Sequence, residues 1–384
     1  MATDTSLAVD LDVLTVASPR LRTVGVEEEL LLVDHATGAP VAAGSSVLAA
    51  GTALPVGALQ SELQEQQVET ATTPTRTIGD LGEQLVSLRR VADVAARTAG
   101  ARVAALATSP LPVRPVLSDG ARFRAIEAQM GLTCQEQLTC GCHVHVAIDS
   151  ADEGVAVLDR IRPWLPLITA LAANSPFWGG RDTSYASYRT QAWSRWPGTG
   201  PTDIFGSAAA YQDVVARMLA TQTLLDGGMV YFDARLSHRH PTVEIRVADV
   251  CLDVRDTMLV ASLCRALVQT AADQWRTGVP PSTQPTVVVR LAAWRASRFG
   301  LSGDLVHPVE DRLVPARDAL SALLHHVSGA LEAAGELAWA REEMSALLAR
   351  GTGADRQRAQ LSRGGDLSTV VARAVDATLA DRRA

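Results

Sequence analysis

The chain contains no lysine, because all 35 of its basic residues are arginine. This absence excludes Walker A NTPases, protein kinases and enzymes that form a Schiff base, since each of these classes needs a lysine amine at its site. If the protein handles phosphate, it must therefore do so with arginine, backbone amides or metal ions.

Other features are scarce too. Five cysteines in 384 residues form a sparse, odd set, which suits a reducing compartment better than a disulfide framework. No apolar run is long enough to span a bilayer, and residues 1–19 carry no basic segment typical of a signal peptide. The net charge of −7 argues against a nucleic-acid or anionic-membrane partner. We therefore expect a cytoplasmic protein with a flexible N-terminus over residues 1–20.

The order of the predicted elements indicates the fold class. Alternating or apolar β-branched segments predict strands at residues 22–34, 102–108, 141–148 and 242–250. Helical spacing follows a predicted capping box at Asp80 and Glu83, and a second helix is predicted to begin after an N-cap at Asp253. From Val314 onwards the pattern is almost wholly helical. Because strands come early and helices late, we expect an α+β fold with a mainly antiparallel sheet.

The first predicted strand carries three consecutive glutamates. Since side chains alternate between the faces of a strand, Glu27 and Glu29 share one face, whereas Glu28 lies among apolar residues. Either that apolar face is imperfectly buried or Glu28 has a partner. Two carboxylates on one face repel each other, and a divalent cation would relieve that repulsion. The alternative is an exposed edge strand with scattered acids.

A second strand contains the sequence CGCHVH at residues 140–145. Alternation places His143 and His145 on one face and Cys140 and Cys142 on the other, so one zinc ion cannot use both sets. Taken alone, such a histidine pair is more often two partly exposed side chains than a site.

The third strand, TVEIRV at residues 242–247, has Val243, Ile245 and Val247 on one face. Glu244 and Arg246 on the other face could form a surface ion pair or supply an oxygen ligand and a phosphate clamp. Considered together, the three strands predict one sheet face lined with metal ligands.

Two further segments carry candidate residues. Residues 61–70 contain Glu62, Glu65 and Glu69 but show neither strand nor helix periodicity, so composition alone predicts a solvated loop. Residues 174–201 form a long predicted loop, in which positions 177–196 hold six of the sixteen aromatic residues. This loop is either an aromatic plug between sheet and helices or a substrate loop in which an arginine pairs with a carboxylate.

Several motifs occur in the order typical of one known family. They are GVEEE at 25–29, Glu62 with Glu69, CGCHVH at 140–145, NSPFW at 174–178, RDTSYASYRT at 181–190 and EIRVAD at 244–249. This set resembles the YbdK-type carboxylate-amine ligases, also called glutamate–cysteine ligase type 2, from about Val24 to the C-terminus. The resemblance implies a single glutamine synthetase-like catalytic domain over residues 21–384. A curved, mainly antiparallel sheet would form a funnel, with helices packed outside and a helical C-terminal part.

The same resemblance implies an ATP-dependent reaction. A carboxylate, such as the γ-carboxylate of glutamate, would be activated as an acyl phosphate and joined to an amine such as cysteine, with release of ADP and phosphate. It also implies two or three Mg²⁺ or Mn²⁺ ions, whose ligands would be Glu27, Glu29, Glu62, Glu69, His143 and Glu244. A homodimer or larger homo-oligomer is consistent with the family.

The resemblance also assigns residues to substrate and nucleotide. Arg246 would meet the γ-phosphate and, with Glu244, would be catalytic, and His145 would lie close by. Arg181 and Arg189 lie inside a matching motif and are the candidates for a substrate carboxylate, and Arg298 is a further candidate for nucleotide or substrate. Cys142 is given no role.

Two other functions remain open from the residues alone. A metal-dependent amidohydrolase also uses a His-x-His pair with carboxylates, although such enzymes often add a carboxylated lysine, which this chain lacks. A non-catalytic protein that binds amino acids or nucleotides is the second alternative, and the combined set of acids, histidines and Arg246 argues against it.

Overall fold

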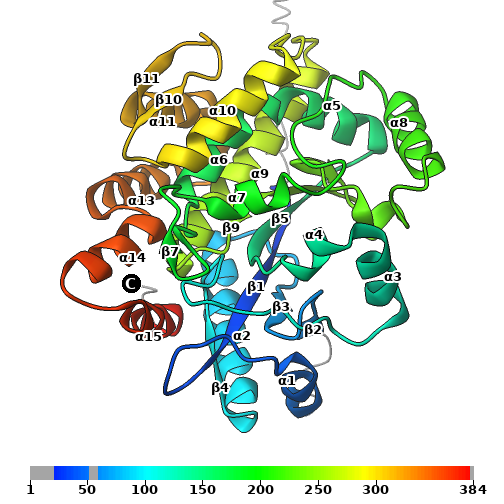
Figure 1. The fold of residues 1–384 in the computed structure, drawn as a ribbon. Coiled ribbons are helices and arrows are strands. Elements are labelled where there is room, and N and C mark those ends of the chain that lie inside the picture. The colour runs from blue at the N-terminus through cyan, green and yellow to red at the C-terminus, as the bar shows by residue number, and fades with distance from the viewer. Residues whose placement is uncertain (1–20, 52–58, 381–384) are drawn as a thin grey trace, which may run out of the picture.

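A seven-stranded sheet organises the molecule. The computed structural model describes residues 21–51 and 59–380, so the predicted flexible segment 1–20 lies outside the described residues. The strand order is β2 (Gln60–Ser61), β3 (Gln67–Ala71), β1 (Val24–Asp34), β5 (Gly141–Ala147), β9 (Thr242–Asp249) and β8 (Ala234–Leu236), with β4 (Ala101–Ala104) beside the end of β1. Every strand pairing in this sheet is antiparallel (Figure 1), which confirms the predicted fold class.

Helices and short strands surround the sheet. The N-terminal half contains α1 (Gly44–Ala50), α2 (Ile78–Thr98), α3 (Ala121–Met130), α4 (Leu132–Gln135), α5 (Ala151–Ile161), η2 (Arg162–Trp164), α6 (Leu165–Leu171), β6 (Phe177–Trp178), β7 (Arg181–Asp182) and α7 (Tyr188–Trp193). The C-terminal half contains α8 (Ala208–Ala220), η3 (Gly227–Met229), α9 (Val254–Arg276), α10 (Thr286–Phe299), β10 (Asp304–Val306), β11 (Leu313–Pro315), α11 (Ala316–His326), α12 (Ser328–Ala333), α13 (Leu337–Arg350), α14 (Gly353–Ser362) and α15 (Leu367–Thr378). The predicted helical C-terminal part is therefore confirmed.

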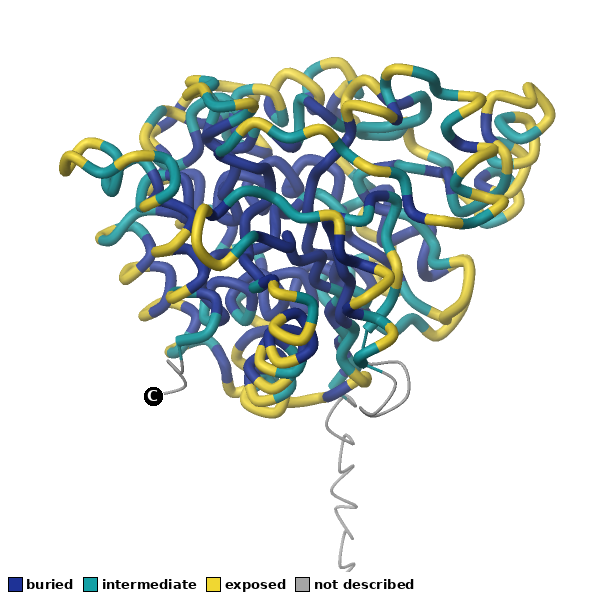
Figure 2. Tube along the Cα trace, turned by 60° about the horizontal axis from the view of Figure 1, so that its bottom comes forward, coloured by how far each residue is buried: buried dark blue, intermediate teal, exposed yellow. Residues whose placement is uncertain are grey.

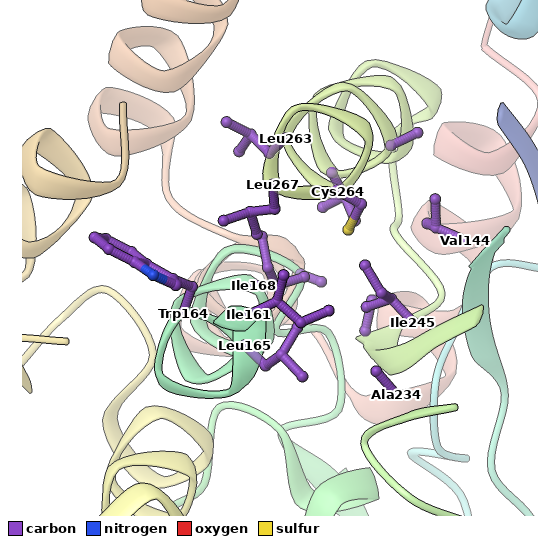
Figure 3. Close-up of a cluster of buried hydrophobic side chains, with 14 of the residues drawn as sticks. Val144, Ile161, Trp164, Leu165, Ile168, Ala234, Ile245, Leu263, Cys264 and Leu267 are labelled. Atoms are coloured by element: carbon purple, nitrogen blue, oxygen red, sulfur yellow. The ribbon is translucent and has the colours of Figure 1, made fainter. Parts of the chain in front are cut away.

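The largest hydrophobic core lies between one face of the sheet and the helices α5, α6 and α9. Figure 3 shows Val144 of β5 and Ile245 of β9 on the sheet side of this core, with Ile168 of α6 and Leu267 of α9 opposite them. Figure 2 shows buried residues concentrated in the middle of the molecule and exposed residues on the outer turns. Burying this face leaves the polar side chains of the same strands on the opposite face.

Glu28 finds the partner that its position required. Its carboxylate accepts two hydrogen bonds from the guanidinium of Arg89 on α2, at 2.6 and 2.7 Å, and a third from the hydroxyl of Thr257. Arg89 is completely buried and also donates to the carbonyls of Cys251 and Leu252. The charge on the core side of β1 is thus neutralised within the protein.

The helix starts were predicted with mixed success. Asp253 caps α9 as predicted, because its side chain accepts from the amide of Arg255. The capping box at Asp80 and Glu83 was wrong, since α2 begins one turn earlier and its N-cap is Thr77, whose hydroxyl accepts from the Asp80 amide. The hydroxyl competes well for an unpaired amide, and the acidic residue then lies in the first turn, where the helix dipole favours it.

Two strand predictions need correction. Residues 67–71 do not belong to a solvated loop: they form β3, which is buried and pairs with β1.

In β9, the register against β5 shifts between Cys142 and Val144, so that two β9 residues lie in the interval opposite His143. Val247 falls at this irregularity and is only half-buried, so the apolar face of β9 is less regular than alternation predicted.

No helix among the described residues is long and apolar enough to cross a membrane. All five cysteines are buried and unpaired with one another, as expected for a chain without a disulfide framework.

Candidate active site

The strand register gathers the predicted polar residues on one face of the sheet. Glu29 lies opposite Glu69 of β3, and Glu27 lies opposite His143 of β5. His145 is in turn paired with Glu244 of β9. Because neighbouring strands lie about 5 Å apart, residues from four segments of the sequence become neighbours.

These side chains line a cavity of about 980 Å³. Its wall includes all six predicted metal ligands, together with His145 and Arg246, and is completed by residues of α3, of α7 and the turn after it, and of β8 and its flanking loops. The volume lies at the upper end of the range for small-molecule sites, so there is room for a substrate larger than a single amino acid.

The two histidines face Glu27. Its carboxylate oxygens lie 3.5 Å from Nδ1 of His143 and 3.4 Å from Nε2 of His145. Burial raises the pKa of Glu27, but its contacts with His143 and His145 outweigh this and hold the pKa below the usual range. The pKa of His143 is lowered by burial and by the charge of Arg246. Among the described residues, Nε2 of each histidine is buried and makes no hydrogen bond, although that of His145 lies close to the Glu27 carboxylate.

The carboxylates on the β3 side repel one another. Burial, followed by the charge of Glu29, raises the pKa of Glu62 to about 8. Burial and the charge of Glu62 raise the pKa of Glu69 well above its usual value. One oxygen of Glu29 accepts a hydrogen bond of 2.6 Å from the backbone amide of Gly141, which fixes its carboxylate at the start of β5.

These groups fit a site for divalent cations. Three sets offer ligand atoms within 4.8 Å of one another: Glu27, Glu69 and His143; Glu27, His145 and Glu244; and Glu29, Glu62 and Glu69. Carboxylate oxygens suit Mg²⁺ or Mn²⁺, and imidazole nitrogens suit transition metals better than Mg²⁺. A divalent cation would relieve the crowding of the acids and occupy the histidine nitrogens that lack hydrogen bonds. His145, which the sequence placed only near the metals, belongs to one of these sets.

Glu244 differs from the other candidate ligands because two arginines already hold it. Arg235 of β8 donates to both of its oxygens, at 2.8 and 3.2 Å, and Arg246 contacts it from the same strand. Burial raises the pKa of Glu244, but Arg246 and Arg235 outweigh it and keep the group ionised. Glu244 therefore positions Arg246, and a metal would have to share its carboxylate with a guanidinium.

The three remaining arginine candidates lie elsewhere. Arg181 is exposed in β7 and does not line the cavity. Arg298 contacts the carbonyl of Ser184 and lies 5.3 Å from the ring centre of Tyr185, where it joins α10 to the loop. Arg189 is buried, donates to the carbonyl of Arg246 at 3.3 Å and has an unpartnered Nε within the described structure. Only Arg189 is close to the polar face.

The aromatic loop has two parts with different surroundings. Trp178 and Tyr185 each pack against Tyr188, with ring centres 5.4 and 5.8 Å apart, and plug the space beside α10. Trp193 and Trp196 instead line the cavity, where Trp196 donates to Gln137 at 3.0 Å. The loop is thus a plug at its start and a cavity wall at its end.

Arg235 is the main residue that sequence reasoning missed. It lies on a three-residue strand whose neighbours, Ala234 and Leu236, are apolar, so a weak alternation ahead of the turn at residues 237–241 was available as a signal. Its importance depends on the β8–β9 pairing, which places it opposite Glu244.

Comparison with known proteins shows which sequences this chain resembles. The family model described as glutamate-cysteine ligase family 2 matches residues 23–373. A candidate glutamate–cysteine ligase 2-1 of Streptomyces avermitilis is 53% identical over 93% of this chain and 99% of its own length. A candidate glutamate–cysteine ligase 2 of Streptomyces coelicolor is 52% identical over 94% of this chain and all of its own length.

Solved structures show a similar fold at low sequence identity. A glutamate–cysteine ligase from Francisella tularensis, in complex with AMP, has a TM-score of 0.65 and 14% identity, covering 95% of this chain and 90% of that one. A bifunctional glutathione synthetase from Pasteurella multocida has a TM-score of 0.66 and 16% identity, covering 94% of this chain and 52% of that one. The expected α+β fold with a mainly antiparallel sheet is confirmed, and the glutamate–cysteine ligase from Francisella tularensis has a similar fold.

Proposed function

Since the chain belongs to glutamate-cysteine ligase family 2 and is an ATP-dependent ligase, we propose that it activates a carboxylate as an acyl phosphate and joins it to an amine, releasing ADP and phosphate. The γ-carboxylate of glutamate is the proposed acid, and cysteine is one proposed amine. The observation that carries the proposal is a single cavity that combines crowded acids, two unpartnered histidine nitrogens and the paired guanidiniums of Arg235 and Arg246.

The reaction brings anions together. When a substrate carboxylate attacks the γ-phosphate of ATP, a bond forms between a carboxylate oxygen and phosphorus, and the bond to ADP breaks. The proposed holders of divalent cations are Glu27, Glu29, Glu62, Glu69, His143 and Glu244, with His145 as a further candidate. Such ions, when bound, supply positive charge that neutralises the phosphates.

Arg246 supplies the fixed positive charge of the proposed mechanism. Burial lowers the pKa of its guanidinium, but Glu244 more than offsets this, so the group stays charged in the cavity wall. Arg235 anchors Glu244 on the opposite side and also donates to the carbonyls of Gly228 and Val230. We infer that Arg246 faces the transferring phosphate while Arg235 keeps its partner in place.

The amine then attacks the acyl carbon, and phosphate leaves. This step requires that water be kept from the acyl phosphate. Trp193 and Trp196 are suited to that purpose, because they pack on Tyr231 with ring centres 4.9 and 5.7 Å away and form an apolar wall of the cavity.

The test is ATP turnover by purified protein with Mg²⁺, L-glutamate and a panel of amines. Phosphate release should rise when an acceptor amine is present, and mass spectrometry should find the amide. Glu29→Gln and Arg246→Ala should abolish turnover, whereas Arg217→Ala on the exposed face of α8 should not. Absence of ATP turnover across a broad panel of acids and amines would refute the proposal, and amide hydrolysis without ATP would favour an amidohydrolase.

A further inference from the structure

A second cavity of about 390 Å³ adjoins the first. It lies between α6, α7, α10 and the edge of β9, and Figure 1 shows these elements side by side. The two cavities share Trp193, Trp196, Tyr231 and Arg246 in their walls. A molecule in the second cavity would therefore lie next to the guanidinium that is proposed to face the phosphate.

The second cavity exists because β8 is short. β8 covers β9 only as far as Ile245, and the amide of Arg246 donates to the carbonyl of Asp233 at 2.9 Å as the last bond of that ladder. Beyond this point the edge of β9 at Val247 faces the cavity. The strand irregularity at Val247, which the sequence did not reveal, thus contributes an apolar wall.

Asp233 is the one carboxylate in the lining of this cavity. Its backbone is fixed by bonds to Gly200 and Arg246. Among residues 21–51 and 59–380, its side chain makes no hydrogen bond or ion pair. Burial raises the pKa of Asp233 to about 7, opposed by the charge of Arg290. A carboxylate in such a place is stabilised by a ligand that brings a positive charge.

Arg290 of α10 supplies the opposite charge. It is exposed at the rim, and within the described structure it too has no ion pair or hydrogen bond, although it is near enough to affect Asp233. The wall also holds the guanidiniums of Arg189 and Arg246, together with polar side chains of Thr169, Thr190, Gln191, Ser194 and Thr199. Its apolar part includes Pro166, Phe232, Val247, Ala293 and Trp294. The lining therefore suits a zwitterion with a large apolar group.

We propose, building on the ligase function above, that this second cavity binds the amine substrate and that this substrate is an α-amino acid with a large apolar side chain. Its ammonium group pairs with Asp233, its carboxylate with Arg290, and its side chain packs between Val247 and Trp294. Cysteine would leave most of the cavity to water, so it is a poor occupant.

The kinetic test compares L-phenylalanine with hydroxylamine, which is small enough to trap an acyl phosphate without filling the cavity. In Asp233→Asn, the ratio of kcat/KM for L-phenylalanine to that for hydroxylamine should fall about tenfold to a hundredfold, as expected when a charged hydrogen bond is lost. Asp213→Asn on α8, whose side chain is exposed, is the matched control and should leave the ratio unchanged.

Arg290→Gln tests the other end of the substrate and, being at an exposed position, does not threaten the fold. It should raise the KM for L-phenylalanine but not for phenethylamine, which lacks the carboxylate. The proposal would be overturned if Arg290→Gln raised the KM for L-phenylalanine and for phenethylamine equally. It would also be overturned if neither Arg290→Gln nor Asp233→Asn changed the KM for L-phenylalanine.

Calorimetric titration without ATP separates this proposal from the ligase function. L-Phenylalanine should bind more tightly than L-cysteine, and Asp233→Asn should abolish that preference. If binding follows this pattern but no ATP is turned over, the ligase function fails and the amino-acid site stands. If turnover occurs while L-cysteine binds as well as L-phenylalanine, the ligase stands and the apolar amino-acid site is wrong. If neither binding nor turnover is found, both are wrong.

Discussion

The glutamates on the two faces of β1 have opposite surroundings. On the core face, Glu28 is buried, but Arg89 neutralises its charge and Thr257 donates a further hydrogen bond. On the cavity face, Glu27 and Glu29 meet histidines and further carboxylates, and the unpartnered histidine nitrogens add to the excess of unsatisfied groups. A carboxylate with its own arginine stabilises the fold, whereas acids crowded without one indicate a ligand.

Removing the guanidinium of Arg89 from the core face should have the largest effect on stability. Arg89→Met leaves Glu28 buried without a counter-charge, so we expect a loss of about 3–5 kcal/mol in the free energy of unfolding, measured with urea. The control is Arg97→Met on the same helix, where the side chain is 61% exposed and should contribute under about 1 kcal/mol. If Arg89→Met lowered the free energy of unfolding by less than about 1 kcal/mol, Glu28 would not be held as an ion in the core.

Divalent ions should stabilise the protein by binding to the acids of the cavity face and not to the acid of the core face. Binding of Mn²⁺ at a hundred times its dissociation constant stabilises a folded protein by about 2.7 kcal/mol. We expect this gain in the wild type and in Glu28→Gln, even though the latter is less stable without metal. Glu29→Gln should lose it, because its carboxylate belongs to one of the ligand sets.

Urea unfolding with Mn²⁺ or with EDTA measures both parts of this prediction. If Glu28→Gln lost the Mn²⁺ gain and Glu29→Gln kept it, the assignment of the two faces would be reversed.

Alternation along the strands made the two faces predictable from the sequence. It placed Glu27 and Glu29 together, separated His143 and His145 from the cysteines, and left Glu28 either on an imperfectly buried face or with a partner. It could not identify Arg89 as that partner, because the two residues meet only when α2 packs against β1 and α9.

The remaining features depend on tertiary pairing. β3 is polar in sequence, and its residues become a strand because the edge of β1 offers hydrogen bonds to them. The second cavity follows from the early end of β8 and the irregularity in β9, neither of which has a periodic signal. Arg181 and Arg298 were chosen by motif, but they lie outside the lining of both cavities.

Arg235→Met would remove the arginine of β8 that pairs with Glu244. Glu244, on the cavity face, would then be held less firmly than Glu28 is on the core face. We expect kcat to fall about tenfold to a hundredfold, corresponding to roughly 1.4–2.8 kcal/mol, because Glu244 and Arg246 would no longer be fixed. The KM for ATP should change less than kcat if Arg235 acts by positioning. A larger effect on KM than on kcat would assign Arg235 to substrate binding instead.

The smallest effect should come from relieving the repulsion between the acids. The raised pKa of Glu62, about 8, means that the folded state holds its proton more tightly than the unfolded state does. Ionisation of Glu62 therefore costs stability progressively as the pH rises from about 4.5 to 8. Because Glu62 is only partly buried, water screens its charge and the gain should be well below the full value of the pKa shift. In EDTA, Glu62→Gln should be more stable than the wild type by about 1 kcal/mol at pH 8, with no gain at pH 4. Glu83→Gln, at an exposed acid on α2, should show no such trend. A Glu62→Gln variant that is less stable than the wild type at pH 8 without metal would show that Glu62 is neutralised inside the protein, as Glu28 is.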